Sequence, residues 1–140
     1  MSEVEMGRIK HGGFFGPSER VIYEYKFEHP TSEGEIKSIS MYKDVDGEQV
    51  GKLEYLKNGA KVKLNVFNIM DWSSTKYAEA LLAKFLKVMR KEKAQVIEHQ
   101  MFDTDDKTHS KLVLFRENGF SVESRGNITG YSEYFLSMTI

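Results

Sequence analysis

The 140-residue sequence lacks cysteine, and this absence excludes several kinds of site. Without cysteine there can be no disulfide, no thiolate nucleophile and no metal site with a cysteine ligand. Serine-hydrolase, P-loop and dinucleotide-binding glycine motifs are missing as well. His99 and His109 stand apart without further ligands, and the stretch "DTDDKTHS" lacks the central glycine and terminal glutamate of a calcium loop. We therefore expect no metal.

Long hydrophobic runs and an excess of one charge are absent too. Twenty basic and 21 acidic residues give a net charge of -1, so the whole molecule does not attract nucleic acid or anionic membranes. No apolar run approaches the roughly 20 residues that span a bilayer, and "MSEVEMGRIKHGG" has no signal-peptide core. We expect a cytoplasmic protein with no nucleic-acid or membrane partner.

Proline is scarce, and nothing in the sequence resembles a linker. The two prolines, Pro17 and Pro30, both lie in apparent loops, and no repeat or low-complexity tract divides the chain. Hydrophobic residues make up 40% of the sequence, which is enough for a buried core. We predict one domain over residues 1–140, with residues 1–19 as an N-terminal arm that contains the loop "HGGFFGPSE".

The first half of the chain shows the period-two pattern of strands. "RVIYEYKF" alternates Val21, Tyr23, Tyr25 and Phe27 on one face. Asp-Gly at 46–47 and Asn-Gly at 58–59 are dipeptides of tight hairpin turns, and they separate three β-compatible runs. These runs predict an antiparallel meander of strands at about 35–43, 48–57 and 60–69.

The last strand of this meander contains a change of phase. Val62, Leu64 and Val66 alternate in one phase, whereas Phe67 and Ile69 continue in the other. Such a slip predicts a β-bulge. A bulge near the end of a strand releases backbone groups from pairing, and a ligand can then use them.

Two helices are predicted in the second half of the chain. Lysines and an arginine on the outer faces of the first helix indicate a solvated surface rather than a basic binding patch. Its apolar residues recur on one helical face: Ala78, Leu81, Leu82, Phe85, Leu86 and Met89. "DDKTHSKLVLFRENG" predicts the second helix, with Gly119 as its left-handed stop. Further strands are predicted at "AQVIEHQMF", "FSVESR" and "YSEYFLSMTI".

The order of these elements defines the predicted architecture. Because the first helix connects two strands, a right-handed crossover places "AQVIEHQMF" parallel to the strand that ends at Ile69. The fold class is therefore α+β. It consists of a mixed, mostly antiparallel sheet, with a meander, a βαβ crossover and a C-terminal strand pair, and two main helices.

This order, with a bulged strand before the long helix and "LFRENGF" at the end of the second, resembles the GNAT superfamily of acyl-CoA-dependent N-acetyltransferases. The resemblance covers residues from about 20 to 140. The short "EHPTSEGE" leaves no room for the two helices that the family usually inserts after its first strand. The resemblance implies that acetyl-CoA or another acyl-CoA is bound as co-substrate and that its acyl group is transferred to a substrate amine.

The resemblance also implies a set of coenzyme-binding residues. The family opens its long helix with a Q/R-x-x-G-x-G/A loop, and here Ser73, Lys76 and Ala78 occupy the three defined positions, of which only Ala78 conforms. Lysine in place of glycine departs from a loop that lets phosphate approach the backbone. The implied binding residues are Phe67, Asn68 and Ile69 on the bulged strand, Ser73, Ser74, Thr75, Lys76 and Ala78 at the helix start, and Thr108 on the second helix.

The same helix start has a simpler interpretation. Asp71, Ser73 or Ser74 can cap the helix, with Lys76 pointing into water. Unpaired amides and a partial positive charge are present at any helix N-terminus, so both interpretations remain open.

Catalysis would need a base and a proton donor. Phe115 occupies the position of the tyrosine that often serves as general acid in the family, and phenylalanine cannot donate a proton. Candidate bases are Glu54, Asp71, Glu98 and His99, and Tyr131 or Tyr134 could replace the missing acid. For each of them, an exposed or purely structural role is the alternative, and Phe115 fits the core.

Two rival functions follow. The first is a catalytically inactive GNAT-fold module that binds a protein partner, which Lys76 and Phe115 both favour. The second is a small β-rich binding protein whose resemblance is coincidental, which predicts that the strands at Ile69 and Gln95 pair along their whole length. Splayed strands beside an open helix start favour a coenzyme, whereas a side chain that fills the gap favours the binding module.

Overall fold

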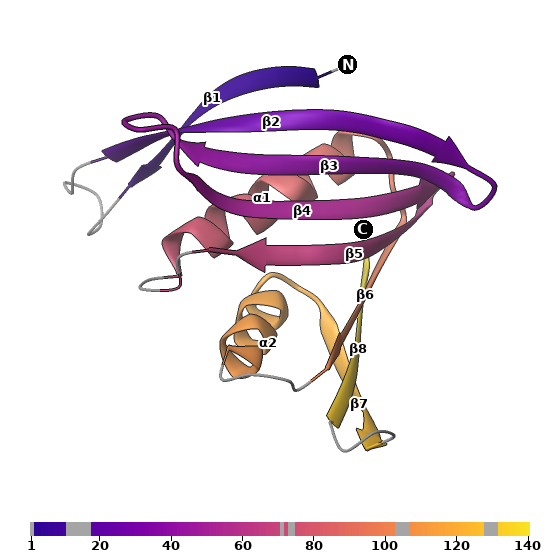
Figure 1. Ribbon diagram of the computed structural model, residues 1–140. Helices are drawn as coiled ribbons and strands as arrows, with labels where there is room; N and C mark the ends of the chain where they lie inside the picture. The colour runs from indigo at the N-terminus through magenta and orange to yellow at the C-terminus, as the bar shows by residue number, and fades with distance from the viewer. Residues whose placement is uncertain (1, 11–17, 71, 73–74, 103–106, 128–131) are drawn as a thin grey trace.

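The computed structural model describes residues 2–10, 18–70, 72, 75–102, 107–127 and 132–140 (Figure 1). This part of the chain forms eight strands and two helices. In chain order they are β1 (Ser2–Lys10), β2 (Ser18–Thr31), β3 (Gly34–Lys43), β4 (Gln49–Asn58), β5 (Lys61–Ile69), α1 (Lys76–Lys91), β6 (Val96–Phe102), α2 (Thr108–Glu117), β7 (Ser121–Asn127) and β8 (Ser132–Thr139).

The described strands form one sheet in the order β1-β2-β3-β4-β5-β6-β8-β7. All neighbours are antiparallel except β5 and β6, which α1 connects in parallel. The predicted α+β class is confirmed, with its meander, its crossover and its C-terminal strand pair. None of the described helices is long and apolar enough to cross a membrane.

The strand β1 is not predicted by the sequence. It pairs with β2 from Ser2 opposite Lys26 to Lys10 opposite Ser18, so most of the proposed arm belongs to the sheet. Its apolar residues Val4 and Met6 are 65% and 47% exposed, so their alternation marks no buried face. Most of "HGGFFGPSE", residues 11–17, lies outside the described residues.

The hairpin between β2 and β3 leaves no room for inserted helices, as predicted. Thr31 pairs with Gly34, and its hydroxyl donates to the Gly34 carbonyl oxygen at 2.8 Å and accepts from the Glu33 amide at 3.2 Å. Gly34 has a φ of 139°. This region of backbone space is accessible mainly to glycine.

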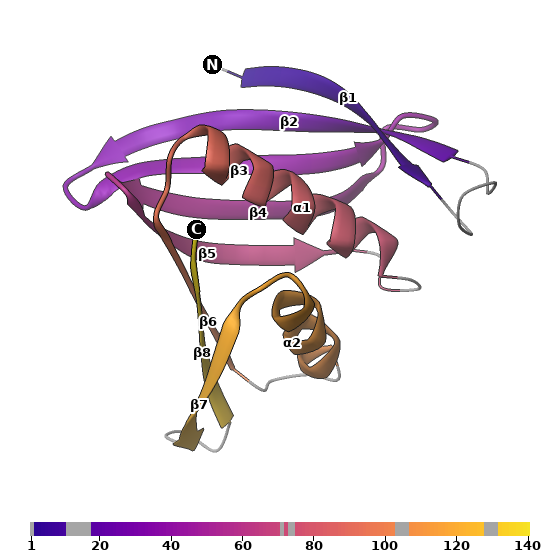
Figure 2. The same ribbon diagram turned by 180° about the vertical axis from the view of Figure 1, so that it is seen from behind.

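Both helices cover the same face of the sheet, as Figure 2 shows. Phe85 of α1 packs on Tyr55 of β4, with ring centroids 5.3 Å apart, and Phe115 of α2 packs on Phe67 of β5 at 5.2 Å. The predicted apolar stripe of α1 is fully or almost fully buried. The core therefore lies between the sheet and these two helices.

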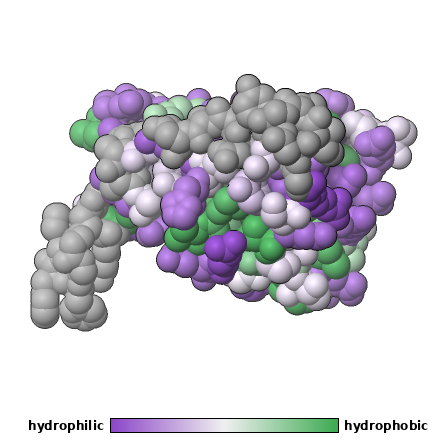
Figure 3. Space-filling view, turned by 90° about the horizontal axis from the view of Figure 1, so that it is seen from below, coloured by the Kyte–Doolittle hydropathy of each residue, from purple (hydrophilic) through white to green (hydrophobic). Residues whose placement is uncertain are grey.

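Exposed hydrophobic side chains are scattered over the described surface. They belong to several strands, loops and the C-terminus: Val4, Met6, Phe27, Val45, Val66, Met70, Phe102 and Ile140. Viewed from below, hydrophobic residues lie among hydrophilic ones (Figure 3). Isolated exposed hydrophobic residues are normal for a folded protein, so a candidate site is better sought where the surface is concave.

Candidate functional site

The strands β5 and β6 pair over only four residues and then part. Their pairing runs from Lys61 opposite Val96 to Leu64 opposite His99, although β5 continues to Ile69 and β6 to Phe102. Figure 1 shows the two strands diverging. The prediction of full-length pairing, made for a coincidental resemblance, is therefore wrong.

The predicted bulge lies where the two strands separate. On the β4 side of β5, Tyr55 pairs with Leu64 and Glu54 with Val66, so Asn65 is the extra residue. Val66 is 39% exposed, whereas Phe67 and Ile69 are buried on the helix side. The phase change in the sequence therefore marks a real bulge, and it coincides with the opening of the gap.

His99 links the two strands at their last paired residues. Its Nδ1 lies 2.7 Å from the Leu64 carbonyl oxygen, which can only accept a hydrogen bond, so Nδ1 carries the proton and Nε2 is left as an acceptor. Burial lowers the pKa of the His99 imidazole, the bond to Leu64 partly opposes this effect, and the charge of Lys111 adds to the lowering. The ring is therefore neutral at physiological pH.

Aromatic side chains fill the helix side of the gap. Phe115 is fully buried, and its ring centroid lies 5.1 Å from His99, 5.2 Å from Phe67 and 5.1 Å from Phe120. The interpretation of Phe115 as a core residue is confirmed. Phenylalanine provides no proton donor at this position. The helix side of the gap is occupied by these aromatic side chains.

The opposite side of the gap is hollow. A cavity of about 330 Å³ is bordered by Lys63 and Asn65 of β5, by Glu98, Gln100 and Phe102 of β6, and by His99. Glu98 forms an ion pair with Lys61, with Nζ 3.2 Å from Oε1, and its side chain is 21% exposed. Gln100 donates a hydrogen bond to the carboxylate of Glu133. The cavity thus combines a carboxylate with a neutral imidazole.

The structure brings only some of the candidate catalytic residues together. Glu98 and His99 border the cavity. Glu54 lies on β4 opposite Val66 and Ser38 and is not among the described residues of the cavity. Tyr134 is partly buried on β8 opposite Met101. Asp71 and Tyr131 lie outside the described residues.

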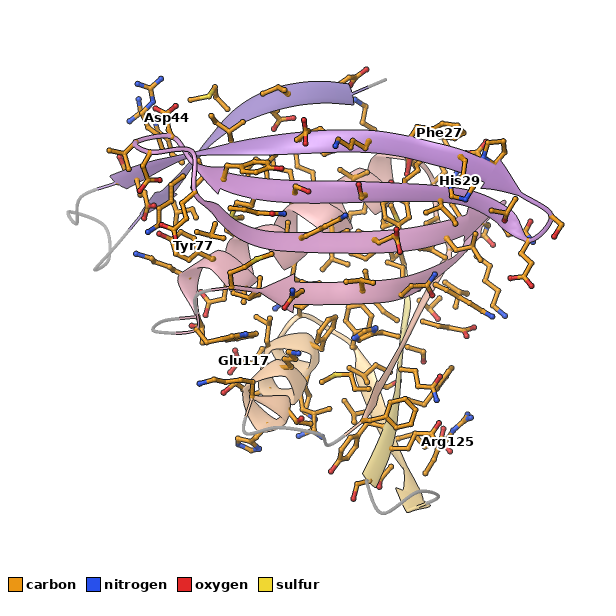
Figure 4. The ribbon with its side chains drawn as sticks, in the orientation of Figure 1. Phe27, His29, Asp44, Tyr77, Glu117 and Arg125 are labelled. Carbon is orange, nitrogen blue, oxygen red and sulfur yellow. The ribbon has the colours of Figure 1, made fainter. Side chains whose placement is uncertain are left out.

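The start of α1 lies beyond the end of β5, at the end where the gap opens. Lys76 Nζ is 3.4 Å from Glu19 Oε1 and 4.8 Å from the centroid of the Tyr77 ring, so it does not simply point into water. The Tyr77 hydroxyl donates to Glu19 at 2.7 Å and 3.0 Å. Figure 4 shows Tyr77 at this end of the sheet.

Other predicted coenzyme-binding residues have ordinary structural contacts. Thr75 precedes the helix, but its hydroxyl donates to Glu79 Oε1 at 2.9 Å and caps no backbone amide. Ala78 is fully buried, Asn68 is exposed, and the Thr108 hydroxyl lies 3.5 Å from the Phe102 carbonyl oxygen. Ser73 and Ser74 lie outside the described residues.

The sequence does not indicate the role of Glu19. Its contact with Tyr77 joins residues 58 positions apart, and no local motif marks such a contact. Glu79 could have been recognised as an acidic residue in the first helical turn, where it favours the helix dipole. Both carboxylates contact side chains at the start of α1: Glu19 those of Lys76 and Tyr77, and Glu79 that of Thr75.

No protein-family model and no curated protein matches the sequence. Solved structures do match. They include nourseothricin acetyltransferase, with a TM-score of 0.59, 13% identity and coverage of 74% of this chain and 65% of that chain. They also include the PaiA N-acetyltransferase of Thermoplasma acidophilum in complex with coenzyme A, with a TM-score of 0.60, 17% identity and coverage of 75% and 61%.

A third match is a protein from Desulfovibrio desulfuricans described as an acetyltransferase of the GNAT family. Its TM-score is 0.61, its identity 13%, and the match covers 74% of this chain and 69% of that chain. The chain therefore has the fold of the GNAT acetyltransferases, as predicted. It covers less than two thirds of the length of the first two structures.

Proposed function

We propose that the protein binds an acyl-CoA, such as acetyl-CoA, in the gap between β5 and β6 and transfers the acyl group to a substrate amine. The observation that carries this proposal is the parting of the two strands after four residue pairs, at a bulge centred on Asn65. The CoA complex among the similar folds supports the choice of ligand.

The two ends of the gap suit the two ends of this ligand. At the start of α1, the partial positive charge of the helix N-terminus favours a pyrophosphate, with Thr75 and Lys76 beside it. Ser73, Ser74, Ala78 and Thr108 also belong to the proposed coenzyme set. At the bulge, backbone amides of Phe67, Asn68 and Ile69 would stabilise negative charge on the reacting carbonyl oxygen.

Acyl transfer forms a bond from the amine nitrogen to the carbonyl carbon and breaks the bond from that carbon to sulfur. The amine loses a proton, and we assign its removal to Glu98 or to Nε2 of His99, which both border the cavity. Phe115 cannot protonate the departing thiolate, so Tyr131, Tyr134 or water supplies that proton. Glu54 and Asp71 stay as further candidate bases.

A second candidate is a GNAT-fold module that binds a protein partner and catalyses nothing. The aromatic cluster around Phe115 favours it, because these side chains fill the helix side of the gap. The ion pair of Lys76 with Glu19 favours it too, because it already neutralises the lysine.

Calorimetric titration with acetyl-CoA and with free CoA separates the two candidates. We expect micromolar binding that Lys76→Glu weakens at least tenfold. Arg90→Glu is the matched control, since it makes the same charge reversal on an exposed residue near the other end of α1. Circular dichroism checks that both variants fold. Absence of heat at millimolar ligand would refute coenzyme binding and leave the binding module.

A second assay tests transfer itself. Release of CoA from acetyl-CoA is followed with a thiol-reactive chromophore over a panel of primary amines. Because the protein has no cysteine, the reagent reports only the released coenzyme. Glu98→Gln should lower kcat with little change in acetyl-CoA affinity, whereas Glu123→Gln on β7 should change neither. Tight coenzyme binding without release of CoA thiol in the presence of any amine of the panel would contradict transfer to amines.

A further inference from the structure

A larger cavity lies at the other end of α1. It has a volume of about 670 Å³ and separates the C-terminal half of α1 from β1, β2, β3 and β4 on the helix side of the sheet. Figure 2 shows this half of α1 in front of β2 and β3, on the side of the sheet that the helices cover. A volume of this size is typical of small-molecule sites, which commonly measure about 300–1,000 Å³.

The sheet side of this cavity is aromatic. Tyr25 and Phe27 of β2 and Tyr55 of β4 line it. Phe27 is 44% exposed, near His29 at the hairpin end of β2 (Figure 4). An aromatic ring this exposed on the face that the helices cover leaves apolar surface available to a ligand.

Hydrogen bonds hold the two tyrosine rings in place. The Tyr25 hydroxyl donates to Glu5 Oε2 and the Tyr55 hydroxyl donates to Glu92 Oε2, each at 3.3 Å. Burial raises the pKa of both hydroxyls, so they stay protonated as donors. A wall whose polar groups already have partners keeps its shape without a ligand and loses little entropy when one binds.

The helix side of the cavity is basic, although the sequence pattern favours a solvated surface for the lysines of α1. Lys84, Lys87 and Lys91 of α1 face it, and its lining includes five lysines but only three glutamates. Lys84 pairs with Glu5 at 2.6 Å, and Lys37 pairs with Glu92 at 2.7 Å. Within the described chain, no ion pair or hydrogen bond is found for Lys87 or Lys91. The hydrogen bond from Lys84 lowers the pKa of the Glu5 carboxyl, and the charge of Lys87 adds to this lowering. The excess of lysine over glutamate leaves positive charge on this side.

We propose that this cavity binds an anionic aromatic small molecule, namely a carboxylate on one or two fused rings. Its ring would lie against Tyr25 and Phe27, and its carboxylate would lie beside Lys87 and Lys91. Aromatic surface on one wall and a surplus of lysines on the other fit a ligand with the same two parts. A cation of equal size would meet the surplus lysines instead.

This site is separate from the proposed coenzyme site. Lys87 follows Lys76 by 11 residues, which is about 16 Å along a helix. Both ligands can therefore be bound at once, and the two proposals can fail independently. Acetyl-CoA should leave binding at this cavity unchanged.

The experiment uses the fluorescent probe 1-anilinonaphthalene-8-sulfonate on the folded protein. We expect a saturable rise in fluorescence with a micromolar Kd. Naphthalene-2-carboxylate should displace the probe at least tenfold better than the neutral naphthalene-2-carboxamide. Equal displacement by the two compounds, or no saturable binding at millimolar probe, would overturn the proposal.

Paired variants locate the bound probe. Lys87→Glu with Lys91→Glu should weaken probe binding at least tenfold. Arg90→Glu with Lys93→Glu makes the same change of charge at exposed residues of the same region that do not line the cavity, and it should leave the Kd within twofold. Phe27→Ser, which removes an exposed ring, should also weaken binding. Equal effects of the two double variants would refute a site at this cavity.

Discussion

His99 Nδ1 donates a hydrogen bond to the carbonyl oxygen of Leu64 at 2.7 Å, across the last residue pair that joins β5 and β6. A hydrogen bond from a side chain to the backbone therefore lies at the end of the paired region of β5 and β6. Beyond it the bulge at Asn65 turns β5 out of register with β4, and the gap opens. The protonation state of one imidazole is thus tied to the geometry of the candidate site.

Acidification should destabilise the protein through His99. Its folded-state pKa is lowered from the ordinary 6.5, so below about pH 6.5 the unfolded chain binds a proton that the folded chain excludes. The free energy of unfolding should fall as the pH drops through this window, by at most about 1.4 kcal/mol per pH unit from this group.

Urea denaturation at pH 7.5 and 5.5 measures this effect. His99→Gln should reduce the difference in unfolding free energy between the two pH values. His109→Gln should leave that difference unchanged, since His109 is exposed on α2. The same pH dependence in His99→Gln and in the parent protein would contradict the assignment to His99.

Phe115 should contribute to stability as a core residue. It is fully buried against Phe67, His99 and Phe120, so Phe115→Ala leaves a cavity and should lower the unfolding free energy by about 3–5 kcal/mol. Phe102→Ala, at a residue that is 47% exposed, should cost no more than about 1 kcal/mol. Chemical denaturation of both variants checks the contrast, and similar losses would argue against a special packing role for Phe115.

Glu19 should weaken coenzyme binding, given the proposed function. Its carboxylate is the partner of Lys76 and Tyr77, and it competes with a phosphate for the lysine. Glu19→Gln keeps the side-chain size, removes the charge and should tighten acetyl-CoA binding about three- to tenfold at low ionic strength. The ion pair is partly exposed, so its loss should cost less than about 1 kcal/mol of stability.

Calorimetry on Glu19→Gln gives the affinity, and Glu48→Gln is the control because Glu48 pairs with Lys43 rather than Lys76. An unchanged Kd in Glu19→Gln would show that this carboxylate does not compete with the coenzyme for Lys76. A Kd that falls equally in both variants would point to net charge instead of the local contact.

Local patterns account for most of the fold. Alternation in β2 and the Asp-Gly and Asn-Gly turns predict the meander, and the phase slip at Val66 predicts the bulge, because each depends on neighbours in sequence. The strand β1 escapes prediction because Val4 and Met6 alternate without being buried. Its presence depends on the free edge of β2, which is a tertiary feature.

The site is less predictable because its contacts join distant residues. Glu98 and His99 can be named from the sequence as ionisable residues of a strand. That both border one cavity depends on how far β6 stays paired with β5. The contact of Glu19 with Lys76 joins β2 to α1 in the same way. Pattern and spacing carry no information on such contacts, which packing alone decides.

Gly34 should be the least replaceable glycine among the described turns. A Cβ at this position would lie 2.5 Å from the Lys57 carbonyl oxygen, and its φ of 139° is itself unfavourable for any other residue. Gly59 also has a positive φ, of 60°, but a Cβ there would meet nothing within 4 Å. Gly34→Ala should therefore cost about 3 kcal/mol or more, against about 1 kcal/mol for Gly59→Ala.

Comparing Gly34→Ala with Gly59→Ala tests whether contact with β4 adds to the steric constraint on the β2–β3 turn. Backbone of Lys57 in β4 lies against the hairpin at Gly34, so the turn is packed onto the neighbouring strand as well as sterically demanding. Thermal and urea unfolding of the two variants measure the difference. Equal losses would contradict a special constraint at Gly34 and would mean that the hairpin moves away from β4 to admit a side chain.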